Sequence, residues 1–122
     1  MTGKELFRKI WAAAVAQRFK RALDLMCMYR TSEGIGCAIG AAFVPIKDAP
    51  KCEGASVSKA TIQLAPQSSW CNQLVKILDR TAPGWRENVS LLHSCQDAHD
   101  KACNSANYRE RLAAIGHANN YF

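Results

Sequence analysis

The sequence lacks several features that would point to particular classes of protein. It has no low-complexity tract and no apolar stretch of the roughly 20 residues that a membrane-spanning helix requires; the Gly-rich run at 34–46 is too short. It has no CxxC pair, and its glycines at 34, 36 and 40 form neither a GxGxxG nor a P-loop pattern. These absences argue against a membrane helix, a paired-cysteine metal motif and a nucleotide-phosphate loop.

What remains is the composition of an ordinary globular chain, with 48% hydrophobic and 21% charged residues. A chain of 122 residues can bury about two-thirds of its unfolded surface, so it needs no disulfide or metal to hold a core. We therefore expect one compact domain spanning 1–122. The six cysteines stand at positions 27, 37, 52, 71, 95 and 103. We expect buried thiols, while disulfide or metal use of these residues stays open.

Positive charge is concentrated near the start of the chain. The first 30 residues carry seven basic side chains against Glu5 and Asp24, which is five of the six net positive charges of the protein. The candidate partner-binding residues in this region are Arg8, Lys9, Arg18, Lys20, Arg21 and Arg30. Such a basic helix attracts nucleic acid, anionic lipid or an acidic protein surface, or else serves as a solvated face.

A helix is predicted to begin at a capping box formed by Thr2 and Glu5. The apolar residues that follow fall at helical spacing and predict a broad buried face. They are Leu6, Phe7, Ile10, Trp11, Ala14, Val15, Ala22 and Met26. The sequence Ala14-Val15-Ala16 resembles a signal-peptide cleavage site, but the preceding Glu5 and the continuing helical pattern favour a cytoplasmic protein.

The rest of the chain predicts a mainly α fold of about four helices around a short two-stranded or irregular β element. The β element is expected at 26–30 with a turn at 31–34, and an extended segment at 58–66. Further helices are expected through about Phe43, from Ser68-Ser69 to Pro83-Gly84, from Trp85 or Arg86 to Cys103, and around Tyr108 to Ile115 with closure at Gly116.

Two constellations of residues carry the chemistry that an enzyme would need. Cys37 is expected near a helix N-terminus, where the dipole stabilises a thiolate, and His99 with Asp97 or Asp100 would supply a base and its orienting carboxylate. The catalytic alternative is therefore Cys37, His99 and Asp100. On the third long helix, Cys95, His99 and Cys103 are spaced four apart, but the outer pair is about 12 Å apart and cannot share one ion. We expect no cofactor and no metal.

Several motifs together resemble a group of short uncharacterised proteins of phages and bacterial genomes. The motifs read CxYR at 27–30, GxxCAIG at 34–40, EGxSV at 53–57, and Leu92 followed by Gln96, His99 and Asp100 in place of the group's LQxxHD. The resemblance spans about residues 5–117. This chain departs from the group after CAIG, because no acidic residue directly follows Pro45. The resemblance implies a phage or mobile-element context and a cytoplasmic location in a bacterial host, and it implies no reaction.

The leading functional hypothesis is a small accessory protein that binds a host protein or protein complex, such as a defence complex, and inhibits it. That partner can itself contain nucleic acid. The alternatives are a thiol-dependent hydrolase or transferase and an electrostatic binder of nucleic acid or an anionic nucleotide. The aromatic residues are not interleaved with the basic ones, so direct nucleic-acid recognition is a minor alternative that only the positive charge supports. No membrane partner is expected, and the oligomeric state stays open.

Overall fold

The computed structural model describes residues 1–16, 37–48, 69–102 and 107–122, with side chains omitted at 69–73 and 100–102. Its elements are α1 (Gly3–Val15), α2 (Ala38–Phe43), α4 (Ser69–Thr81), the 3₁₀ turn η3 (Arg86–Asn88), α5 (Val89–Ala102) and α6 (Asn107–Ala118). The prediction of a mainly helical protein is confirmed. No strand occurs within these ranges, so the predicted β element has no support; its segments at 26–30 and 58–66 lie outside them.

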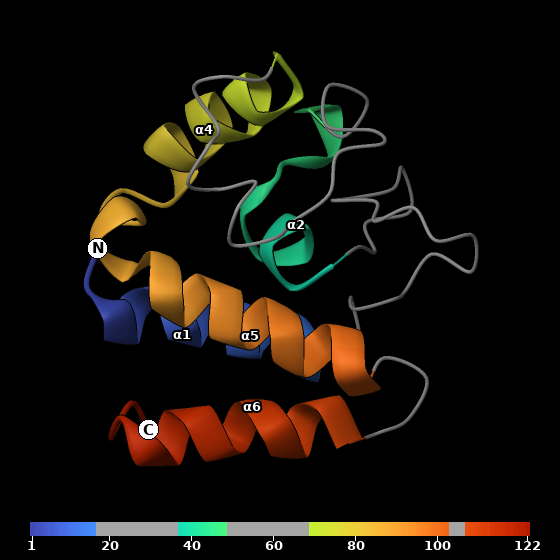
Figure 1. The fold of residues 1–122 in the computed structure, drawn as a ribbon, viewed down its shortest axis with the longest axis vertical. Coiled ribbons are helices and arrows are strands. Elements are labelled where there is room, and N and C mark those ends of the chain that lie inside the picture. Colours follow the sequence, from blue (N-terminus) through green and yellow to red (C-terminus); the bar gives the residue numbers. More distant parts are fainter. Residues whose placement is uncertain (17–36, 49–68, 103–106) are drawn as a thin grey trace.

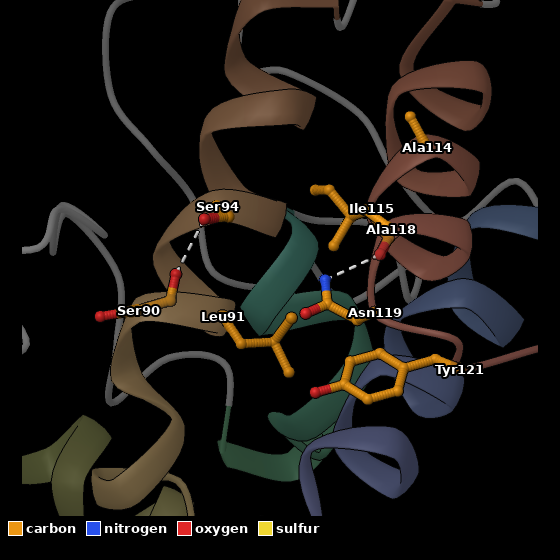
Figure 2. Close-up of a pocket in the computed structure, with 8 residues that line it drawn as sticks. All are labelled: Ser90, Leu91, Ser94, Ala114, Ile115, Ala118, Asn119 and Tyr121. Atoms are coloured by element: carbon orange, nitrogen blue, oxygen red, sulfur yellow. Dashed lines mark hydrogen bonds between the residues drawn. The ribbon is translucent and has the colours of Figure 1, made fainter.

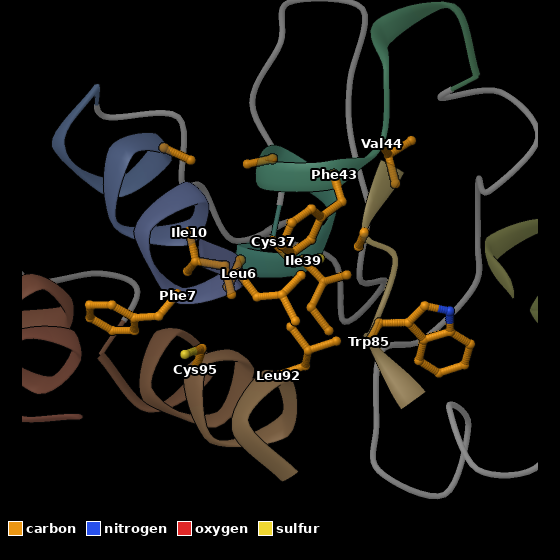
Figure 3. Packing of buried hydrophobic residues seen from close by; sticks show 14 of the residues in the cluster. Leu6, Phe7, Ile10, Cys37, Ile39, Phe43, Val44, Trp85, Leu92 and Cys95 are labelled. Atoms are coloured by element: carbon orange, nitrogen blue, oxygen red, sulfur yellow. The ribbon is translucent and has the colours of Figure 1, made fainter. Parts of the chain in front are cut away.

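Three of the helices pack together and carry the other two. α1, α5 and α6 are in mutual contact, α2 lies against α1 and α5, and α4 contacts α2. Figure 1 shows α5 and α6 side by side, with α1 behind α5 and α4 at the far end of the molecule. A single cluster of buried side chains draws on all five helices, including Leu6, Ile39, Leu78, Leu92 and Leu112. Figure 3 shows α1, α2 and α5 converging on this core.

The capping box predicted for α1 is present. The Thr2 hydroxyl accepts from the Glu5 amide at 3.2 Å, and the Glu5 carboxylate accepts from the Thr2 amide at 3.1 Å. The predicted burial of Leu6, Phe7 and Ile10 is confirmed. The prediction for Val15 is wrong: this residue is 53% exposed at the last position of α1, whereas Ala14 beside it is fully buried. α1 ends at Val15, with Ala16 as its C-cap. The predicted buried positions Ala22 and Met26 lie outside the described residues.

The turn between α4 and η3 is held by a carboxylate and a glycine. Asp79 accepts from the Trp85 indole nitrogen at 2.8 Å and pairs with Arg86 at 3.2 Å. Gly84 adopts a φ of 89°, and a Cβ there would meet the Met1 carbonyl oxygen. This arrangement fits the predicted end of a helix at Pro83-Gly84 and the start of the next near Trp85.

The sequence predicts that Gly116 closes the last helix, and this prediction is wrong. Gly116 lies inside α6. The helix is closed four residues later by Asn120, which takes the left-handed conformation with a φ of 58°. The Tyr121 amide donates to the Gly116 carbonyl at 2.8 Å and the Asn120 amide to the His117 carbonyl at 3.2 Å, which together form a Schellman motif. The motif turns Tyr121 and Phe122 back onto α1.

Candidate partner-binding surface

The exposed side of α1 carries the described part of the basic region. Lys4, Arg8 and Lys9 are all exposed. The Arg8 Nε donates to the Tyr121 carbonyl at 3.2 Å, and none of the three basic residues forms an ion pair with another described residue. The other predicted contact residues, Arg18, Lys20, Arg21 and Arg30, lie outside the described residues.

Two arginines on other elements form ion pairs, unlike the basic residues of α1 among the described residues. Arg80 of α4 pairs at 2.8 Å with Asp48, whose side chain is only 7% exposed, and Arg86 pairs with Asp79. Arg86 also lies 4.5 Å from the centre of the Trp85 ring. These arginines hold structure together, whereas Lys4 and Lys9 of α1 point their charge towards solvent.

The one carboxylate of α1 is engaged at the helix start. Hydrogen bonds from Thr2 hold the pKa of Glu5 below its ordinary value of 4.5. The bond from the Thr2 backbone amide has the larger effect, and the Thr2 side chain has a smaller one. Glu5 therefore remains ionised in its cap. It offsets part of the positive charge near Lys4 but is committed to the capping box rather than to a neighbouring cation.

Two grooves lie between described helices, and one of them borders α1. A groove of about 250 Å³ lies between α1 and α2 and is lined by Lys9 and by alanines at 12, 13, 41 and 42. A wider one of about 460 Å³ lies between α5 and α6 (Figure 2). Leu91 and Ile115 are among its lining residues, and two others, Ser94 and Asn119, donate to the carbonyls of Ser90 and Ile115. None of the residues that line the wider groove is charged.

The thiol of the catalytic alternative serves as a helix cap. Cys37 is the N-cap of α2, as predicted, and its Sγ accepts from the Gly40 amide at 3.4 Å. The neighbouring Ile39 amide donates to the Gln96 side chain of α5 at 3.3 Å. Cys37 is only 2% exposed, so a substrate cannot reach its thiol in this conformation.

The remaining members of that alternative are equally enclosed or undescribed. His99 is 2% exposed and packs edge to face against Tyr108 of α6, with ring centres 6.3 Å apart. Asp100 lies in α5, and its side chain is not among those described. The structure therefore places Cys37 and His99 on two contacting helices but opens neither side chain to solvent.

The metal candidates on α5 show the same burial. Cys95 is fully buried, and burial raises the pKa of its thiol to about 12, which disfavours the thiolate that a metal requires. Cys103 lies outside the described residues, and those residues hold no group of three or more potential metal ligands. The expectation of buried thiols is confirmed for Cys37 and Cys95.

Sequence reasoning missed the contribution of the C-terminal aromatic residues to this surface. Phe122 lies edge-on to Trp11, with ring centres 5.2 Å apart, and against Phe7 at 5.5 Å. It also contacts His117 at 4.8 Å. The signal available in the sequence was the Asn119-Asn120 pair, because asparagine tolerates the left-handed conformation that ends a helix and redirects the chain.

Comparison with protein-family models finds no match, and comparison with curated proteins and with solved structures also finds none. Across the described ranges, none of the helices is both long enough and apolar enough to cross a bilayer.

Proposed function

We propose that this protein is a binding protein that docks through the basic face of α1 onto an acidic surface of a bacterial host protein or protein complex. The supporting observation is the exposed positive charge of Lys4, Arg8 and Lys9, which meets no acidic side chain among the described residues. Complementary charge accelerates encounter and selects among partners, so such a face favours an acidic surface. The resemblance of the sequence motifs to phage proteins motivates a cytoplasmic host factor, such as a defence complex that the protein inhibits.

Burial of the two catalytic candidates favours binding over catalysis. A nucleophile must reach its substrate, and Cys37 and His99 are each 2% exposed. The cap formed by the Cys37 sulfur gives this residue a structural role that explains its position. The thiol-dependent enzyme therefore remains the weaker proposal.

Charge reversal tests the role of α1. The variant carrying both Arg8→Glu and Lys9→Glu changes two exposed residues of α1, and a control carrying Lys47→Glu and Lys76→Glu makes the same charge change at exposed lysines elsewhere. Each protein is immobilised and exposed to a nuclease-treated host lysate at low and high salt. We expect wild type and the control to retain the same host protein at low salt, and the α1 variant to lose it. The variant Lys20→Glu with Arg21→Glu extends the test to the basic residues that follow α1.

Two results would count against the proposal. If the α1 variant retains the host protein as well as the control does, the basic face is not the contact. If capture in untreated lysate disappears with nuclease, the protein binds nucleic acid electrostatically, and the alternative hypothesis gains instead.

A further inference from the structure

One stripe along α1 changes from basic to apolar over three turns. Lys4, Arg8, Trp11 and Val15 are spaced by four, three and four residues, which at 3.6 residues per turn places them within about 60° of one another. We call these four residues the α1 stripe. Its first half carries two exposed cations, and its second half carries the half-buried Trp11 and the exposed Val15.

The aromatic ring of Phe122 extends the apolar half of the stripe. Phe122 is 47% exposed while it packs edge-on to Trp11, and Val15 is 53% exposed one helical turn further along α1. Among the described residues, the other exposed large hydrophobic side chain is Ile46. Two of the three such residues thus lie beside Trp11, and clustered exposed apolar residues of this kind mark interaction surfaces.

The patch is held in place before any partner arrives. The Schellman turn at Asn120 directs the chain back onto α1, and Arg8 holds the Tyr121 carbonyl at 3.2 Å. Phe7, which is fully buried, supports Trp11 on one side and Phe122 on another. An aromatic group whose position is fixed loses little conformational freedom on binding, which favours affinity.

Resting on the proposed function above, we propose that the α1 stripe and Phe122 receive an acidic amphipathic helix of the host partner. Its apolar side chains would cover Trp11, Val15 and Phe122, and its carboxylates would face Lys4 and Arg8. Charge complementarity selects this occupant, because the stripe contains no acidic residue and Glu5 is held in the capping box. A helix laid in a groove with apolar anchors at helical spacing is a common mode of peptide recognition.

A nucleic-acid strand fits this surface less well. Proteins that bind single strands stack bases on aromatic faces and follow the backbone with positive charge. Here both cations of the stripe lie at one end, and the other end is occupied by the aliphatic Val15, which offers no ring for stacking. Aromatic side chains such as Trp11 and Phe122 are instead typical of the anchor positions at protein interfaces.

The direct test uses a designed fluorescent peptide helix with leucines along one face and glutamates at the end expected to meet Lys4 and Arg8. Its dissociation constant is measured by fluorescence anisotropy against wild type, Val15→Ser, Phe122→Ala and Arg8→Glu, with Ile46→Ser as the matched control for loss of an exposed apolar side chain. We expect Val15→Ser and Phe122→Ala each to weaken binding about tenfold, as loss of an interface anchor does. Ile46→Ser should bind the peptide as wild type does. Arg8→Glu should weaken binding, and this loss should be larger at low salt than at high salt.

Other outcomes separate this inference from the function on which it rests. Retention of the host protein by Val15→Ser and Phe122→Ala, with its loss from the Arg8→Glu and Lys9→Glu variant, would overturn the apolar anchor and leave the basic contact standing. Retention by all of these variants would overturn both. Equal binding of a scrambled peptide of the same composition, or tighter binding of an oligothymidine strand, would also overturn the acidic-helix proposal. Thermal unfolding of each variant verifies its fold. If Phe122→Ala does not fold, Val15→Ser alone still tests the apolar contact, because Val15 is exposed.

Discussion

Gly116 makes the packing between α1 and α6 testable by a single methyl group. A Cβ on this residue would lie 2.5 Å from Phe122 Cε2, 2.7 Å from Phe7 Cζ and 2.8 Å from Phe7 Cε1. Phe122 is 47% exposed, so its ring can yield to a new methyl group at lower cost than a fully buried ring. The Phe7 ring is fully buried and cannot do so without displacing its neighbours.

The expected effect of Gly116→Ala is the sum of two opposing contributions. Alanine stabilises a helix interior by about 1 kcal/mol relative to glycine. Forcing a methyl group into a filled core costs about 1–3 kcal/mol. Because the contacts fall well below van der Waals distance and one neighbour is rigid, we expect net destabilisation of about 1 kcal/mol, which corresponds to a fall of about 3–5 °C in Tm for a chain of this size.

Urea unfolding and calorimetry would measure this change, with Ala114→Gly as a control. Ala114 is exposed on the same helix, so its replacement reports helix propensity without the packing contribution. The second control is Phe7→Leu, which removes the outer ring atoms nearest to Gly116. In that background Gly116→Ala should cost about 1 kcal/mol less than in wild type. A Gly116→Ala protein stabilised by the full propensity difference, or a cost unchanged by Phe7→Leu, would refute the packing argument.

Two further predictions concern the helix caps and the thiols. The pKa of Glu5 is lowered in the folded state, so the capping box stabilises the protein at pH values above the ordinary carboxyl range and loses this contribution as the pH falls through the lowered pKa. The stability difference between wild type and Thr2→Ala, measured by urea unfolding, should therefore shrink below pH 4.5; a difference that grows on acidification would contradict this assignment. Because Cys37 and Cys95 are buried, mass-mapped iodoacetamide labelling at neutral pH should modify both only after unfolding. Labelling of native Cys37 faster than a model thiol, abolished by His99→Ala, would restore the enzyme hypothesis.

Local sequence signals were sufficient for the helices whose ends are encoded nearby. Thr2 and Glu5 lie three residues apart and satisfy each other's backbone, so the start of α1 follows from four residues. The cap at Cys37 is equally local, because its side chain accepts from an amide only three residues later. The break at Gly84 is also local, because it depends on a positive φ that glycine tolerates. The mainly helical class follows from such signals and from the spacing of Leu6, Phe7 and Ile10.

The errors arose where a residue has two roles that its neighbours in the sequence cannot distinguish. A glycine near the end of a helical pattern is either a terminator or a point of close contact, and the ring of Phe7, which is remote in sequence, makes Gly116 the latter. Val15 continues the apolar spacing of α1, but the described helices bury Phe7 and Ala14 and leave Val15 exposed. Periodicity predicts the face of a helix and not the length of the surface that covers it.

For the candidate surface, too, some features follow from the sequence and others only from the packing of the helices. The sequence by itself determined that positive charge is concentrated near the start of the chain and that Arg8 and Lys9 belong to a capped amphipathic helix, because charge and helical spacing are properties of adjacent residues. Only the tertiary structure decided that Cys37 and His99 are enclosed and that Phe122 joins Trp11 beside the cations. Burial and long-range contact depend on how separate helices pack, and the return of the chain at Asn120 brings together residues more than one hundred positions apart.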